Sequence, residues 1–261
     1  MTIGQMKAIG PRLLAGRDPS PVEVLNPNSD FPVVLLCEHA GQCVPERLDG
    51  LGIGRDDLDA HIGWDIGAAA VTRHLAELLG APALLQNYSR LVIDCNRPPE
   101  APDSIPEASD GVTIPANRGL DPADRQARID EVFWPFHEAV DGLFDRADRL
   151  AAFSVHSFTP VMDGIRRPWE LSFLYRKDKS TSEALRALVR AQRPEMEIGM
   201  NQPYQIEDAS DWFVPRHGEA RGLAHSLIEI RNDLISHPDQ QRAWAVLLAK
   251  VILEFLKDKE K

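Results

Sequence analysis

The chain has 261 residues, 43% of them hydrophobic and 26% charged, which is an ordinary composition for a globular enzyme. Its 29 Lys and Arg residues against 40 Asp and Glu residues give a net charge of −11, which opposes binding to nucleic acid or to anionic lipid headgroups. Three cysteines without a pairing pattern are typical of a reducing compartment, and no apolar run reaches transmembrane length. We therefore expect a cytoplasmic protein with one domain over residues 1–261 and no nucleic-acid or membrane partner, and we leave open whether it forms a homo-oligomer.

The first half of the chain alternates apolar runs with a segment of helical periodicity. The continuous apolar run at 31–37 predicts a central strand that is covered on both faces. Residues 57–79 have the apolar spacing of an amphipathic helix. Further short strands are predicted at 83–85 and 91–93. The stretch 97–121 carries five prolines and almost no periodicity, so it predicts a long ordered loop or lid.

The second half continues the same alternation. A charged amphipathic helix is predicted over 124–150, a helix over 181–192 with Ser182 as its cap, and a closing helix over 239–257. A short helix is predicted within the polar segment that precedes the last strand, and the strands themselves are predicted at 152–155, 170–175, 197–200 and 223–230. Strands that alternate with helices predict a three-layer α/β/α fold with a mostly parallel, mixed central sheet.

Two histidines stand where predicted strands end. His39 follows the first strong strand, and His156 follows the strand at 152–155. Because the carboxyl ends of neighbouring parallel strands meet at one edge of a sheet, these two side chains can converge. Imidazole is the commonest zinc ligand, and a catalytic zinc usually has three protein ligands and a water. The pattern predicts one divalent metal ion, with Zn²⁺ as the expected identity.

Asp65 is the favoured third metal ligand. It lies near the start of the helix that follows the strand of His39, close to the same sheet edge. Glu38 is a rival because it adjoins His39, although successive residues of a strand point to opposite faces. His61 is four residues before Asp65 and would share its helix face, so a pair of these two residues is a further possibility. The sequence leaves the choice among the three open.

Glu229 lies inside the apolar run 226–230, where an unpaired carboxylate is costly. One interpretation is a general base that takes a proton from a water activated by metal and passes it to the leaving amine. The other is a structural ion pair with Arg231 or another base. A cysteine nucleophile, Cys37 or Cys95 beside one of the histidines, is a less favoured alternative.

Two arginines flank the apolar run that ends at Asp94. Arg90 precedes the run and Arg97 follows it. Guanidinium groups that converge on one sheet edge suit a ligand with two anionic oxygens, because the planar fork of arginine matches a carboxylate. The alternative is that both arginines pair with Asp94 or with other acids. We expect a small-molecule carboxylate substrate, drawn in by these arginines despite the negative net charge.

Together these segments resemble the N-formylglutamate amidohydrolase family between about Phe31 and about Leu234. The ordered motifs that carry the resemblance are Glu38–Gly41, Trp64–Ala68, Ser89–Arg90, Asn96–Pro99, His156–Ser157 and Ile228–Arg231. The resemblance implies a phosphorylase/hydrolase-like architecture similar to the zinc carboxypeptidases and aspartoacylases. It also implies metal-assisted hydrolysis of an N-acyl amino acid.

The resemblance further implies roles for individual residues. Arg90 would polarise the scissile carbonyl, Asn96 and Arg97 would bind the substrate carboxylate, and Arg231 would be a further substrate contact. The chain departs from the wider group at Gln42, three residues after His39, where a glutamate would supply the second metal ligand.

The function expected from these observations is hydrolysis of N-formyl-L-glutamate to glutamate and formate, an activity of histidine degradation. Two alternatives stay open. The enzyme could cleave another N-acyl or peptide-like amide, since pocket shape depends on the path of the loop at 97–121. The chain could also be a catalytically silent protein that binds a carboxylated ligand on the same fold.

Overall fold

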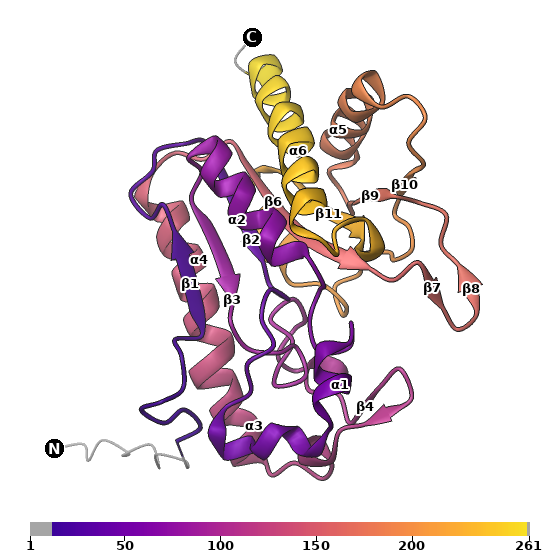
Figure 1. Cartoon of the computed structure of the whole chain (residues 1–261). Coiled ribbons are helices and arrows are strands. Elements are labelled where there is room, and N and C mark those ends of the chain that lie inside the picture. The colour runs from indigo at the N-terminus through magenta and orange to yellow at the C-terminus, as the bar shows by residue number, and fades with distance from the viewer. Residues whose placement is uncertain (1–11, 260–261) are drawn as a thin grey trace, which may run out of the picture.

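A seven-stranded mixed sheet runs through the centre of the molecule (Figure 1). The computed structural model describes residues 12–259. The strand order across the sheet is β1-β3-β2-β6-β11-β9-β10, and the strands are β1 (Val22–Leu25), β2 (Val33–Cys37), β3 (Ala83–Gln86), β6 (Ala151–Phe158), β9 (Leu171–Leu174), β10 (Ile198–Met200) and β11 (Ala224–Arg231). Strands β3, β2, β6 and β11 are parallel neighbours, whereas β1 pairs antiparallel with β3 and β9 pairs antiparallel with β11.

Helices cover both faces of this sheet. One face packs against α2 (Ala68–Leu79), α5 (Lys179–Gln192) and α6 (Pro238–Lys259), and the other packs against α4 (Trp134–Arg146), which continues α3 (Pro122–Arg128) through a π-helical turn (Figure 1). Besides short 3-10 and π-helical turns, the structure contains α1 (Arg55–Asp59) and two small hairpins, β4–β5 (Ala108–Ser109 with Val112–Thr113) and β7–β8 (Val161–Met162 with Ile165–Arg166). The predicted three-layer α/β/α fold with a mostly parallel, mixed sheet is confirmed. No helix within residues 12–259 is long and apolar enough to span a bilayer.

The two apolar strands at the centre of the sheet set the position of the site. All five residues of β2 and all eight of β6 are buried, which explains the uninterrupted apolar sequence of β2 and the mainly apolar sequence of β6. The two strands run parallel, with Leu36 opposite Ser154. His39 follows β2, and His156 lies inside β6 rather than after it, because β6 extends three residues past the predicted end.

The single helix predicted over 57–79 is wrong, because the chain breaks into α1 and α2. Between them, Gly63 packs so close to Leu58 that a Cβ would lie 2.1 Å from the Leu58 carbonyl oxygen, and Gly67 has a φ of +84°. The backbone N–H of Asp65 donates to the carbonyl of His39 at 2.9 Å. This hydrogen bond holds the loop between α1 and α2 against the end of β2, so Asp65 lies at the edge of the sheet.

The strand predicted at 91–93 is also wrong, since these buried residues form turns. The cause is a set of side-chain donors that replace a neighbouring strand. Asn117 donates to the carbonyl of Leu91 at 2.9 Å, and the fully buried Arg128 donates to the carbonyl of Val92 at 2.9 Å. The proline-rich loop and α3 thus hold this segment, and a continuous apolar run alone does not distinguish it from a strand.

Smaller differences concern element ends. Strand β1 was not predicted, and the helix predicted over 124–150 ends at Arg146. Asp178, not Ser182, caps α5, because the Asp178 carboxylate accepts from the backbone N–H of Thr181 at 3.1 Å. Ser182 is buried and shares a hydrogen bond with the hydroxyl of Ser226.

The two glycines that bound α2 allow a matched test of the close approach at the break. Both have positive φ, +84° at Gly67 and +62° at Gly80, but an added Cβ at Gly67 would lie 2.2 Å from the carbonyl oxygen of Ile235, whereas Gly80 has open space. We expect Gly67→Ala to lower the free energy of unfolding by about 1–3 kcal/mol more than Gly80→Ala, because only the former adds a clash to the backbone strain. Urea denaturation of both variants measures the difference, and equal losses would contradict this explanation.

Candidate functional site

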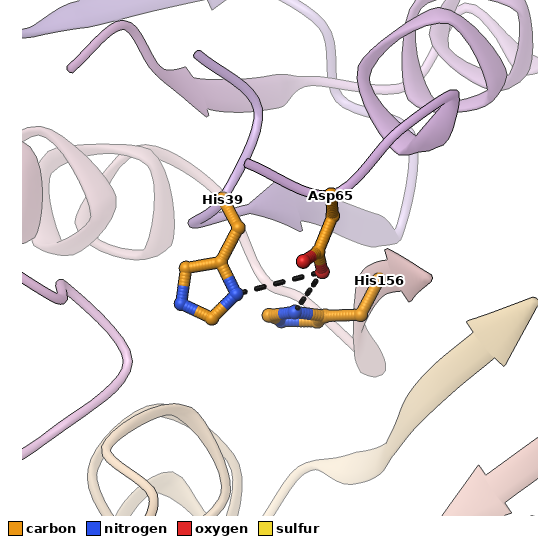
Figure 2. Close-up of side chains that lie close together, drawn as sticks. All are labelled: His39, Asp65 and His156. Atoms are coloured by element: carbon orange, nitrogen blue, oxygen red, sulfur yellow. Dashed lines mark hydrogen bonds and ion pairs between the residues drawn. The ribbon is translucent and has the colours of Figure 1, made fainter. Parts of the chain in front are cut away.

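His39, Asp65 and His156 come together at the carboxyl edge of the sheet (Figure 2). The Nδ1 atom of His156 lies 2.9 Å from Oδ2 of Asp65, and Nδ1 of His39 lies 3.5 Å from the same oxygen. All three side chains are at least 95% buried. Their ligand atoms lie within 4.8 Å of one another, so this group could hold a metal ion.

Each histidine has a second buried carboxylate on its other ring nitrogen. Nε2 of His39 lies 2.7 Å from Oδ1 of Asp94, and Nε2 of His156 lies 3.1 Å from Oε2 of Glu38. A carboxylate on the outer nitrogen fixes the tautomer and ring orientation of a metal-ligating histidine. Both rings therefore present Nδ1 toward Asp65. Among residues 12–259, Nδ1 of His39 has no hydrogen-bond partner although it is buried.

Electrostatics keeps the carboxylates of the cluster ionised. Burial opposes ionisation of Asp65, but the charge of His39 and a hydrogen bond from His156 outweigh it and hold the pKa of this carboxyl well below its usual value. The same balance applies to Asp94, where His39 and Arg90 lower the pKa against burial. Burial also opposes protonation of His156, yet its bonds to Asp65 and Glu38 raise its pKa well above the ordinary value. The cluster thus stabilises positive charge at the His156 imidazole.

The two other candidates for the third ligand have different positions. Glu38 lies on the side of His156 that is opposite Asp65. Its Oε2 accepts from the Ser154 hydroxyl and faces Nε2 of His156, the nitrogen turned away from Asp65. His61 approaches from the side, with Nδ1 3.8 Å from Oδ1 of Asp65. Neither belongs to the group that could hold a metal.

Glu229 lies directly beside His156 in the sheet, since the two residues are register partners on β11 and β6. Its side chain is buried, and Oε2 has no hydrogen-bond partner among the described residues. The pKa of Glu229 is raised to about 7, because burial and the charge of Asp65 outweigh the opposing charges of His156, His39 and Arg90. The alternative interpretation, an ion pair between Glu229 and Arg231, is not found in the described part of the chain, where Arg231 pairs with Asp233.

Arg90 adjoins the cluster and contacts two of its carboxylates. Its guanidinium donates to Oδ2 of Asp94 at 2.8 Å and to Oδ1 of Asp65 at 3.4 Å, and the side chain is 24% exposed. Arg97 also reaches Asp94, at 3.6 Å, and pairs with Asp103 at 2.8 Å. Pairing of both arginines with Asp94, one of the two interpretations of the sequence, is what the structure shows.

Asn96 and Arg231 are held by other contacts. The Asn96 side chain is buried, donates to Asp211 at 2.9 Å and accepts from the backbone N–H of Phe213 at 2.9 Å. Arg231 donates to Asp233 at 2.8 Å and to the carbonyl of Pro168 at 3.2 Å. Arg90 therefore contacts the cluster directly, and Arg97 contacts it only through Asp94. Asn96 and Arg231 bind other partners.

Comparison with known proteins identifies the family of the chain. The sequence profile for N-formylglutamate amidohydrolase matches residues 31–236. The chain belongs to the N-formylglutamate amidohydrolase family. Among solved structures, a gene product from Agrobacterium tumefaciens is 36% identical, with a TM-score of 0.90 over 96% of this chain and 100% of that chain. The N-formylglutamate amidohydrolase from Ralstonia eutropha JMP134 is 19% identical, with a TM-score of 0.67 over 92% of this chain and 100% of that chain, and so shares the fold. No curated protein matches the sequence significantly.

As a member of the N-formylglutamate amidohydrolase family, the chain is a hydrolase that acts on amide bonds. The alternative of a cysteine nucleophile finds no support in its structure. Cys37 and Cys95 are fully buried, and burial raises the pKa of both thiols well above the usual range, which disfavours the reactive thiolate.

Sequence reasoning missed two residues that this amidohydrolase places close to the cluster. Asp94 was considered only as a partner for arginines, although its contact with His39 orients a candidate ligand. An acid at the end of the apolar run 91–93 was the available signal, because such a carboxylate needs a buried partner. Arg167 gave no signal, since it follows Arg166 in a polar stretch with no periodicity.

The raised pKa of Glu229 predicts how the stability of the metal-free amidohydrolase depends on pH. Between the ordinary value of 4.5 and about 7, the folded carboxyl keeps a proton that the unfolded chain releases, so stability falls as pH rises through this window. Glu229→Gln cannot ionise and lacks this fall. From pH 5 to pH 8 we expect the free energy of unfolding of the unsubstituted protein to drop by up to about 3 kcal/mol more than that of Glu229→Gln. Urea denaturation across this range provides the comparison, and parallel pH profiles would show that Glu229 ionises normally.

Proposed function

We propose that this protein is a metal-dependent amidohydrolase that cleaves N-formyl-L-glutamate to glutamate and formate. The observation that carries the proposal is the convergence of two imidazole Nδ1 atoms on one carboxylate, with each Nε2 held by a second carboxylate. Family membership supports the amide-bond chemistry. Such an activity would serve amino-acid catabolism in the cytoplasm, and histidine degradation in particular.

The residues present fit a zinc ion. His39, Asp65 and His156 offer two nitrogens and one oxygen, the three-ligand type of catalytic zinc site, and the unpartnered Nδ1 of His39 is the buried polar atom that a metal would satisfy. When bound, zinc supplies a Lewis acid and lowers the pKa of a coordinated water toward neutrality. Asp94 and Glu38 would orient the two imidazoles.

Glu229 is the proposed general base. Its unpartnered Oε2 lies on the strand beside His156, so it can take a proton from the attacking water and deliver it to the leaving amine. A carboxyl whose pKa is near neutrality is suited to both steps. Arg90, which is partly exposed beside Asp65, is proposed to donate hydrogen bonds to the carbonyl oxygen as negative charge develops on it.

The first prediction for the site concerns metal content. We expect the purified protein to hold about one zinc per chain, and His39→Ala, His156→Ala and Asp65→Ala each to lose it while the fold survives. Glu38→Gln keeps all three ligands, so it should bind zinc only about 10- to 100-fold more weakly, and His61→Ala should bind it normally. Elemental analysis and zinc titration distinguish these outcomes. Full zinc content in both His39→Ala and His156→Ala would place the metal elsewhere.

The activity itself is tested by a hydrolysis screen over N-formyl, N-acetyl and larger N-acyl forms of Glu, Asp and Gln, with added zinc and with a chelator. We expect N-formyl-L-glutamate to be the best substrate and the chelator to abolish turnover. Cleavage of a different acyl group would confirm an amidohydrolase activity but contradict N-formyl-L-glutamate as its substrate. Binding of N-formyl-L-glutamate without any turnover would instead identify a catalytically silent carboxylate-binding protein.

Within this assay, Glu229→Gln should keep zinc while kcat falls by a factor of about 100 to 10,000, because glutamine preserves size but not basicity. Arg90→Ala should lower kcat with little change in KM, since its contact strengthens only in the transition state. Thermal melting of the zinc-loaded variants is the control. A Glu229→Gln protein that melts lower but turns over normally in its folded fraction would assign Glu229 a structural role only.

A further inference from the structure

Arg167 is a buried cation that the structure leaves without a counter-ion. The residue is 8% exposed, and no carboxylate in residues 12–259 lies within ion-pair distance of its guanidinium. Its donors reach only neutral groups: Nη1 approaches the hydroxyls of Thr159 and Tyr204, each at 3.2 Å, and Nη2 approaches the sulfur of Met162 at 2.8 Å. A desolvated guanidinium without an acid partner is unfavourable, so this position suits an anionic ligand.

Arg167 lies close to the metal-binding cluster. Its Cζ is 6.0 Å from the centre of the Phe158 ring, and Phe158 is two residues beyond His156 on β6. Residues two apart on a strand share a face and are separated by about 7 Å. Arg167 thus packs on a residue that shares the strand face of the candidate ligand His156.

Tyr204 contacts the guanidinium of Arg167 and is within electrostatic range of Glu229, the proposed base. Arg167 stacks on the Tyr204 ring with Cζ 5.1 Å from its centre, and the tyrosine is 37% exposed. Burial raises the pKa of the Tyr204 hydroxyl, Glu229 raises it further, and the charge of Arg167 opposes both. Tyr204 therefore feels both charges. A ligand carboxylate at Arg167 would be open to solvent on the side of this partly exposed tyrosine.

Arg231 fixes the backbone that carries Arg167. It donates to the carbonyls of Pro168 at 3.2 Å and Trp169 at 3.5 Å, the two residues after Arg167. On the other side, the backbone N–H of Arg167 donates to the carbonyl of Pro160 at 2.9 Å, across the base of the projecting β7–β8 hairpin (Figure 1). These bonds hold Arg167 in place before any ligand binds, which lowers the entropic cost of binding.

We propose that Arg167 receives one of the two carboxylates of the substrate, and that this contact restricts the enzyme to N-acyl derivatives of acidic amino acids. The inference rests on the proposed function for the identity of the substrate. Both carboxylates of a glutamate whose amide lies at the cluster are within about two residue lengths of it, and Arg167 packs on Phe158, which shares the strand face of His156. Arg97 is the carboxylate receptor predicted from the sequence, but its guanidinium is already paired with Asp103 and Asp94. We therefore assign the second carboxylate of the substrate to Arg167.

The test compares three substrates that differ only in which carboxylate is replaced by a carboxamide: N-formyl-L-glutamate with neither replaced, its γ-amide N-formyl-L-glutamine, and its α-amide N-formyl-L-isoglutamine. For Arg167→Gln we expect KM to rise roughly 10- to 100-fold for N-formyl-L-glutamate, as the loss of a charged hydrogen bond requires. The same rise should appear for one monoamide, the one that keeps the carboxylate bound by Arg167, and be nearly absent for the other. Arg167→Lys should recover part of the loss because it keeps the charge. An unchanged KM for N-formyl-L-glutamate, or equal changes for both monoamides, would overturn the assignment.

Arg221→Gln is the matched control. Arg221 also stacks on an aromatic ring, with Cζ 4.7 Å from the centre of Phe144, but it is neutralised by Asp141 at 2.6 Å. We expect its KM values to match those of the unsubstituted enzyme. Removing the uncompensated charge at Arg167 should leave the melting temperature of the ligand-free protein unchanged or raised. A lower melting temperature combined with equal KM changes on all three substrates would make Arg167 a support of the hairpin and contradict the proposal.

Calorimetric binding separates this inference from the proposed function. If the unsubstituted protein hydrolyses none of the three compounds but binds N-formyl-L-glutamate roughly 10- to 100-fold more tightly than Arg167→Gln does, the proposed activity is wrong and the carboxylate site stands. If it hydrolyses N-formyl-L-glutamate and Arg167→Gln binds and turns over this compound equally well, the activity stands and the carboxylate site is wrong. Failure of the unsubstituted protein to bind any of the three compounds contradicts both.

Discussion

The site depends on one buried carboxylate, that of Asp65, held between two imidazoles. Its Oδ2 accepts from the backbone N–H of Ser157 at 3.1 Å and from His156, while its own backbone N–H donates to the carbonyl of His39. These bonds tie together the ends of β2 and β6 and the loop that interrupts the helical segment before α2. Because a buried charge is costly unless it is paired, the two histidines and Asp65 constrain one another.

The charges around Asp65 are unbalanced in a way that favours a divalent cation. Four carboxylates, those of Glu38, Asp65, Asp94 and Glu229, surround two imidazoles, and two permanent cations, Arg90 and Arg97, contact the group. Without a metal, His156 holds an extra proton and the pKa of Glu229 rises to about 7, so protons partly offset the excess of negative charge. A bound cation would replace those protons, which couples metal binding to the ionisation of the proposed base.

The sequence predicted the parts of this arrangement that follow from strand periodicity. His39, His156 and Glu229 adjoin or occupy continuous apolar runs, and parallel strands bring such residues to one edge, so their proximity was predictable. The break before α2 was not predictable, because it depends on close backbone approaches at two glycines, and helical spacing does not reveal them. The turns at 91–93 depend on Arg128, a fully buried arginine that looks like a surface residue in sequence. Arg167 was missed for the same reason, since the burial of a lone arginine is decided by distant segments.

The proposed metal binds Nδ1 of both histidines and the Asp65 carboxylate, while each Nε2 contacts Asp94 or Glu38. A crystal of the protein grown with zinc, with anomalous diffraction measured on both sides of the zinc absorption edge, tests this arrangement most directly. We expect one strong peak at about 2.0–2.2 Å from Nδ1 of His39, Nδ1 of His156 and an oxygen of Asp65. A peak bonded to either Nε2 atom, or a zinc-loaded crystal with its peak away from these three residues, would contradict it.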